Sequence, residues 1–153
     1  MDAKTIEIVK ATAPVVKEKG EEITQRMYEI AFGERPEYRR FFQNTWMKNP
    51  EEARRQAGKL AGSVYAYASH IDNLGRLSAA VEHIAKAHVD TNVIAEQYPV
   101  IGKCLLAAMK DVLGDAASPE VIQAWAHAYE ALAGILINRE REMYQEQNDA
   151  LFT

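Results

Sequence analysis

The chain has 153 residues, a length typical of one domain, and 48% of them are hydrophobic, enough to form a core without a disulfide or a structural metal. Its net charge of −4 argues against nucleic acid as a partner, because nucleic-acid binding needs a basic surface. Cys104 is the single cysteine, which excludes an intrachain disulfide and a cysteine-based metal cluster.

The sequence also argues against a membrane location. It contains no run of about 18 apolar residues that would mark a transmembrane segment. The opening stretch, MDAKTIEIVKATAPVV, lacks the continuous apolar region of a secretory signal. We therefore expect a soluble, cytoplasmic protein without a transmembrane segment.

Hydrophobic residues recur at three- and four-residue spacing, with no sustained strand alternation, which predicts an all-α fold. Gly20, Gly33 and Gly114 mark helix ends, while Asn49-Pro50 and Ser118-Pro119 mark helix starts. A short turn opens at Pro36, and the stretch from about 145 to 153 is expected to be a fraying tail of a single domain spanning 1–153. The predicted helices cover residues 3–19, 21–33, 50–71, 76–88, 96–113 and 119–144.

One of the four histidines lies on an apolar helix face. His88 continues the stripe formed by Leu77, Val81 and Ile84, whereas His83 and His127 lie on polar faces and His70 is ambiguous. On this stripe alone, a hydrogen-bonded core histidine is the commoner explanation, and a metal ligand the less common one.

Two further polar residues lie on apolar faces. Glu140 follows Leu132 and Leu136 at four-residue spacing, where a buried carboxylate costs free energy unless it has a partner. Tyr98 begins the apolar stripe of the helix 96–113. Each has an ordinary explanation alone, but together with His88 they indicate a carboxylate and a phenol that orient an imidazole from behind, as occurs for metal-bound histidines. Because no other ligands lie nearby in sequence, we expect the metal to be inside a cofactor.

The helix 50–71 supplies a facing wall. Its apolar face contains a polar residue, Gln56, followed by Leu60, Val64, Tyr67 and Ile71. Three aromatic residues lie upstream, namely Tyr28, Phe41 and Phe42. Taken alone, they are explained by ordinary core packing.

These residues, in this order, resemble the globin family, specifically bacterial single-domain haemoglobins and the haem domain of flavohaemoglobins. The resemblance covers nearly the whole chain and is densest in YASHIDNL, AAVEHIAKAH, EQYPVIGKCLL, VLGDAA, AWAHAYEAL and INRERE. It implies the globin fold, a three-over-three helical sandwich that encloses haem b (protoporphyrin IX iron).

The resemblance also implies roles on the proximal side of the haem. His88 in KAHVDTNVIAEQYP matches the histidine that is the axial ligand of the iron. Tyr98 matches the tyrosine that hydrogen-bonds this histidine, and Glu140 matches the glutamate that completes the group.

On the distal side, Tyr28 in RMYEIAF matches the tyrosine that stabilises the bound gas, and Gln56 matches the distal glutamine. Phe42 matches the phenylalanine stacked on the haem edge, and Leu60 matches the apolar lid over the ligand. The stretch between Phe42 and Gln56 is a few residues longer than is usual in the family. Its residues Trp46 and Met47 could pack over the pocket mouth or extend into solvent.

Three functions fit such a site. The first is an oxygen-binding globin for storage or delivery, with O₂, NO and CO as diatomic ligands. The second is a nitric oxide dioxygenase that forms nitrate and borrows a separate flavin- and NAD(P)H-dependent reductase. The third and weakest is a haem-based gas sensor. The chain ends at Thr153 without a G-x-G-x-x-G dinucleotide fingerprint, so we expect oxygen binding first. The family contains monomers and homodimers, and the sequence does not select between them.

Overall fold

The computed structural model describes residues 2–42, 51 and 65–151, and within these ranges every regular element is helical, as predicted. The predicted helix 50–71 lies mostly outside these residues, although 65–69 are helical. Three short 3₁₀ segments are η1 (Pro36–Phe42), η2 (Leu74–Leu77) and η3 (Gly114–Ala116). The complete α-helices are α1 (Ala3–Glu18), α2 (Gly20–Glu34), α4 (Ser78–Asp90), α5 (Gln97–Leu113) and α6 (Pro119–Leu151).

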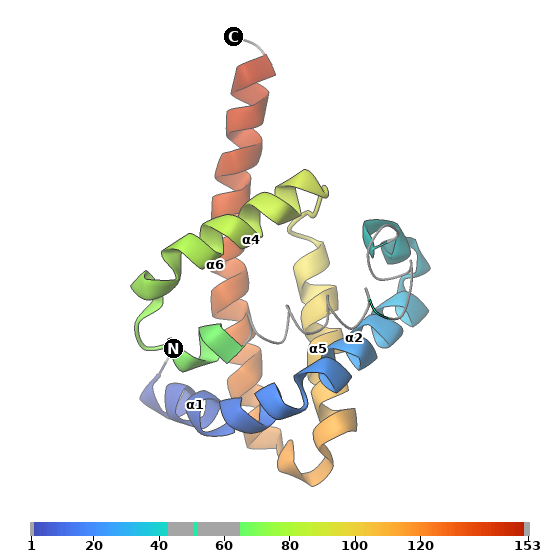
Figure 1. Ribbon diagram of the computed structural model, residues 1–153, viewed down its shortest axis with the longest axis vertical. Coiled ribbons are helices and arrows are strands. Elements are labelled where there is room, and N and C mark those ends of the chain that lie inside the picture. Colours follow the sequence, from blue (N-terminus) through green and yellow to red (C-terminus); the bar gives the residue numbers. More distant parts are fainter. Residues whose placement is uncertain (1, 43–50, 52–64, 152–153) are drawn as a thin grey trace.

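Helix α6 is the axis of the fold, because α1, α4 and α5 all pack against it, while α2 packs mainly against α5. Figure 1 shows α4 and α1 crossing α6 at different heights, with α5 running alongside. This arrangement brings α4, α5 and α6 together at one end of the core.

Local sequence signals explain where these helices begin and end. The Asp2 carboxylate accepts a 2.8 Å hydrogen bond from the Thr5 backbone N–H, which caps α1. The predicted cap of α6 is confirmed by a 3.3 Å bond from the Val121 N–H to the Ser118 hydroxyl. Helix α5 ends at Gly114, whose φ of 57° is a conformation that other residues adopt at a steric cost.

Several predicted boundaries were wrong. Helix α4 begins and ends two residues later than predicted, at Ser78 and Asp90. Gly20 begins α2 and does not separate the helices, because only Lys19 lies between α1 and α2. The predicted fraying tail from residue 145 is instead the last two turns of α6, which projects beyond the other helices (Figure 1). Five of the seven residues from 145 to 151 are polar, so no apolar stripe marks these turns. Side-chain bonds one turn apart, such as Gln145 to Asp149 at 3.1 Å, support them locally.

The main core lies between α1, α2, α5 and α6 and includes Val9, Ile23, Met27 and Met109. Hydrogen bonds at the edge of this core attach neighbouring segments to α6. The Trp125 indole donates to the Thr12 hydroxyl at 2.8 Å, and the Tyr67 hydroxyl donates to the Ala128 carbonyl at 2.9 Å. Burial raises the pKa of Tyr67 to about 12.

A second apolar cluster fills the junction of α4, α5 and α6 and contains Ala85, Tyr98, Ala133 and Leu136. The most buried side chains of α4 are Ala85 and Val89, one position beyond the stripe that the sequence predicted. The side chain of His88 is 33% exposed, so it lies at the edge of the core and not inside it. None of the described helices is long and apolar enough to cross a membrane.

Candidate functional site

Three polar side chains from three helices meet at the junction of α4, α5 and α6. The Nδ1 atom of His88 lies 2.8 Å from the Tyr98 hydroxyl oxygen and 3.1 Å from Oε2 of Glu140. The Tyr98 hydroxyl in turn donates a 2.6 Å hydrogen bond to the same Glu140 oxygen. The structure thus brings together the three residues that the sequence singled out on separate apolar faces.

The positions of the protons in the group of His88, Tyr98 and Glu140 follow from the number of donors. Tyr98 has one hydroxyl proton, and its shortest contact directs this proton to Glu140. The Nδ1 atom of His88 faces two oxygens that can both accept, so the consistent tautomer carries its proton on Nδ1. In the neutral ring the other nitrogen, Nε2, then carries the lone pair, and it has no hydrogen-bond partner among the described residues.

Burial strengthens the hydrogen bonds between Glu140 and its two partners. The Glu140 side chain is only 4% exposed, so its charge depends on the two hydrogen bonds that it accepts. Burial first, and the Glu140 carboxylate second, raise the pKa of Tyr98 above its usual value. The phenol therefore keeps its proton and remains a hydrogen-bond donor across the neutral pH range.

Tyr129 of α6 fixes the backbone beneath Tyr98. Its hydroxyl donates a 2.7 Å bond to the Tyr98 carbonyl, and burial raises its own pKa. The ring of Tyr129 lies where a Cβ atom on Gly102 would be, so the close approach of α5 and α6 requires glycine at position 102. Tyr129 was not predicted, because a contact between residues 27 positions apart leaves no local pattern in the sequence.

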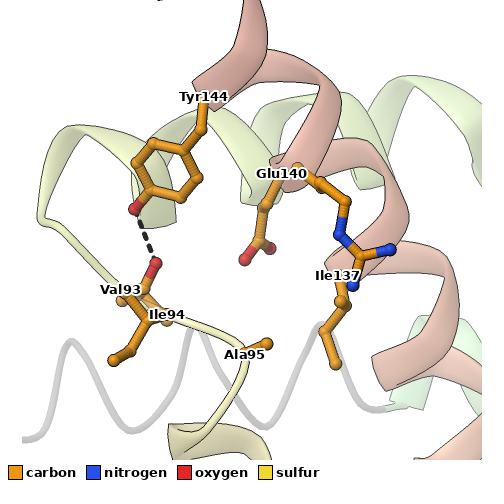
Figure 2. A pocket seen from close by; sticks show the side chains of 7 residues that line it. Val93, Ile94, Ala95, Ile137, Glu140 and Tyr144 are labelled. Atoms are coloured by element: carbon orange, nitrogen blue, oxygen red, sulfur yellow. Dashed lines mark hydrogen bonds between the residues drawn. The ribbon is translucent and has the colours of Figure 1, made fainter.

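Tyr144 of α6 fixes the segment that joins α4 to α5. Its hydroxyl donates a 2.6 Å hydrogen bond to the carbonyl of Val93 (Figure 2). The backbone N–H of Val93 in turn donates a 2.9 Å hydrogen bond to the carbonyl of His88. Tyr144 was also missed, although its four-residue spacing from Glu140 places both side chains on one helix face. The two tyrosines together attach this segment and the first turn of α5 to α6.

A charged contact joins α4 to α6 on the surface. The Arg139 guanidinium contacts both carboxylate oxygens of Glu82 at 2.7 Å, and this pair lowers the pKa of Glu82. A bidentate pair restricts the relative orientation of two helices more than a single contact does. It therefore helps to keep His88 in register with Glu140.

The residues predicted for the distal side are described only in part. Tyr28 is 3% exposed in α2, and its ring stacks on Phe32 with the centroids 5.8 Å apart. Phe42 ends η1, but its side chain lies outside the described structure, as do the whole of Gln56 and Leu60.

The family follows from comparison with known proteins. The family model described as "Globin" matches residues 25–136, and the chain therefore belongs to the globin family. It is 45% identical to a flavohemoprotein of Halalkalibacterium halodurans over 150 residues, which is 98% of this chain and 36% of that protein. The chain thus spans about a third of the length of the curated relatives it matches.

Solved structures show the same fold. An engineered carbene transferase from Rhodothermus marinus, described as a candidate nitric oxide dioxygenase, has 33% identity and a TM-score of 0.86, covering 97% of this chain and 99% of that one. The flavohemoglobin of Malassezia yamatoensis, solved with bound FAD and haem, has 27% identity and a TM-score of 0.74. That comparison covers 94% of this chain and 37% of the fungal one.

Proposed function

We propose that residues 1–153 form one globin domain that holds haem b, with Nε2 of His88 as the axial ligand of the iron, and that the domain binds O₂. The observation that carries this proposal is the hydrogen bonding of the opposite ring nitrogen, Nδ1, to Tyr98 and Glu140. An imidazole held in this tautomer has an unpaired nitrogen available for a metal. Membership of the globin family and the haem bound in a related flavohemoglobin support the same assignment.

The donor set fits such a group. With Nδ1 turned towards Tyr98 and Glu140, the ring leaves Nε2 for the iron, and a neutral imidazole is a common axial ligand of haem iron. The His88 side chain is partly exposed, and Nε2 has no hydrogen-bond partner among the described residues. When bound, haem supplies iron with an open position for a diatomic gas and an electron that can be exchanged.

The role of Glu140 is to make the His88 ligand more electron-donating. A buried carboxylate that accepts the Nδ1 proton shifts the imidazole towards its anionic form. Tyr98 supports this by donating to the same carboxylate oxygen, which fixes its position. On the other side, Tyr28 is proposed to donate a hydrogen bond to the bound gas, with Gln56 as a second donor and with Phe42 and Leu60 as apolar contacts of the haem.

Nitric oxide dioxygenation is the second candidate, and the Glu140 contact favours it. In this reaction NO, O₂ and one electron give nitrate, so each turnover needs an electron from a reductase. A strongly donating histidine favours oxidative chemistry over simple reversible carriage. The similarity to flavohemoproteins and to a candidate nitric oxide dioxygenase supports this alternative.

The first test is reconstitution of the purified protein with haemin. The proposal predicts stoichiometric uptake and, after reduction, a spectral change that reverses when O₂ is added and removed. His88→Ala is the control and is expected to lose the axial histidine signature. Unchanged spectra in His88→Ala would overturn the assignment of the ligand.

The second test separates the two functions. NO consumption in air is measured with NADH and a flavoprotein reductase that re-reduces an authentic flavohaemoglobin haem domain in parallel. Sustained formation of nitrate by the chain, lost in His88→Ala, supports the dioxygenase. A single stoichiometric burst that ends in ferric haem supports oxygen binding alone.

A further inference from the structure

A pocket of about 160 Å³ lies behind the His88–Tyr98–Glu140 group, between α6 and the segment joining α4 to α5. Its walls are mainly apolar, and they are formed by Val93, Ile94, Ala95 and Ile137 (Figure 2). His88 is not among its lining residues, whereas Glu140, which contacts Nδ1, is. The pocket therefore lies on the Nδ1 side of the imidazole, away from the nitrogen proposed to hold iron.

One oxygen of Glu140 lacks a partner in this pocket. Both hydrogen bonds that Glu140 accepts, from Tyr98 and from His88, end on Oε2, and no described residue donates to Oε1. The side chain is 4% exposed, and Figure 2 shows its carboxylate pointing into the space between Ala95 and Ile137. An unpaired oxygen of a buried carboxylate is costly, so a donor that enters this space gains a strong, charge-assisted hydrogen bond.

We propose that this pocket is a second ligand site, for a small and mainly apolar molecule that carries one hydroxyl or ring N–H group. The apolar body contacts Val93, Ile94 and Ile137, and the polar hydrogen is donated to Oε1 of Glu140. The side chain of Arg141 lines the site and is exposed, so one side of the pocket is open to solvent and provides an entrance. This inference rests on the pocket and goes beyond the proposed gas-binding function.

Occupancy of this site has a consequence for the imidazole. A donor at Oε1 draws negative charge away from Oε2, which weakens the hydrogen bonds to Tyr98 and to Nδ1 of His88. The bound molecule therefore acts as an effector that makes His88 less electron-donating without touching the gas-binding side.

Phenol and anisole test the binding directly, because they have similar size but only phenol has a polar hydrogen. Calorimetry is done on the haem-loaded ferrous protein under CO, which blocks the open position of the iron. We expect saturable binding of phenol that is about tenfold or more tighter than that of anisole, the factor expected for one hydrogen bond to a charged group. Equal affinities would show that Oε1 of Glu140 does not select a hydrogen-bond donor, and no saturable binding of phenol would show that water alone occupies the pocket. Either result would overturn the proposal.

A pocket-filling variant locates the binding. Ala95→Leu narrows the pocket, whereas Ala80→Leu adds the same atoms on the exposed face of α4. We expect Ala95→Leu to lose at least about tenfold in phenol affinity and Ala80→Leu to keep the affinity of the unaltered protein. Equal affinities in the two variants would place the phenol elsewhere. If Ala95→Leu does not fold, the comparison of phenol with anisole on the unaltered protein still tests whether the pocket selects a hydrogen-bond donor.

The effector consequence has its own readout and rests on the proposed axial role of His88. Phenol, but not anisole, is expected to shift the iron–histidine stretching band of the ferrous protein to lower frequency. If phenol binds and the band does not move, the coupling to the imidazole is overturned while the binding site stands. If no iron–histidine band is present at all, it is the proposed function that fails.

Discussion

The Tyr98 hydroxyl donates a 2.6 Å hydrogen bond to Glu140 across the contact of α5 and α6, and both side chains are buried. This bond is the shortest of the three in the group, and it fixes the carboxylate that also contacts His88. Its removal should therefore affect both stability and the imidazole.

The first prediction concerns the stability of the protein. Tyr98→Phe removes the donor to a buried carboxylate, so it should lower the free energy of unfolding by about 1.5–3 kcal/mol, the range for hydrogen bonds to charged groups. Tyr129→Phe is the matched control, because it removes a bond to an uncharged carbonyl and should cost about 0.5–1.5 kcal/mol. Urea unfolding measures both values. A smaller cost for Tyr98→Phe than for Tyr129→Phe would contradict the assignment of charge to Glu140.

A second prediction concerns the contact of α5 with α6. Gly102→Ala places a Cβ atom too close to the Tyr129 ring, so the ring or the helices must shift, at a cost of about 1–3 kcal/mol. Gly134→Ala is the matched control, since no atom lies within 4 Å of its Cβ position, and alanine in a helix should be up to about 1 kcal/mol more favourable than glycine. In thermal unfolding, we expect the melting temperature to fall in Gly102→Ala and to rise in Gly134→Ala. Destabilisation by both would show that space at Gly102 is not the cause.

The third prediction concerns alkaline pH. The pKa of Tyr67 is about 12 in the folded protein and about 10 when the side chain is solvated. The folded state holds this proton more tightly, so its contribution to stability is present below about pH 10 and is lost as the pH rises towards 12. Tyr67→Phe should cost about 0.5–1.5 kcal/mol at neutral pH, because the bond to Ala128 is lost, and the deficit should shrink above about pH 10. Urea unfolding at several pH values measures the difference in unfolding free energy between the two proteins. A difference that stays constant above about pH 10 would contradict the burial of Tyr67.

The fourth prediction concerns the distal side. Tyr28 is proposed to donate a hydrogen bond to bound O₂, which carries partial negative charge, and such a bond is worth about 1.5–3 kcal/mol. Tyr28→Phe should therefore speed O₂ release by roughly ten- to a hundredfold, with little change for CO. Stopped-flow measurement of both gases provides the test. Equal effects on O₂ and CO would indicate a change in packing against Phe32 and not the loss of a donor.

Sequence patterns predicted the helices and part of the site. His88, Tyr98 and Glu140 were found because each lies on an apolar stripe, and polar residues in such positions need partners. The supporting bonds from Tyr129 and Tyr144 were not predicted, because both end on backbone carbonyls, which any residue offers. The pocket next to Glu140 could not be predicted either, since it depends on how the segment between α4 and α5 lies against α6.

The last turns of α6 were not predicted for a different reason. The stretch 145–151 has no glycine or proline to end the helix and no apolar face to reveal it, so only local propensity indicates that the helix continues. The proposed distal residues Gln56 and Leu60 remain predictions, as does the contact of Phe42 with the haem.

The central claim is that Glu140 acts through Nδ1 on an imidazole whose Nε2 holds the haem iron. The most direct measurement is resonance Raman spectroscopy of the ferrous, haem-loaded protein and of Glu140→Gln, with Thr12→Val as the control, which removes the hydrogen bond to Trp125 in the main core. We expect an iron–histidine stretching band that shifts to lower frequency in Glu140→Gln, because the neutral amide is a weaker acceptor than the carboxylate, and that stays nearly unchanged in Thr12→Val. The same band position in Glu140→Gln as in the unaltered protein would contradict it.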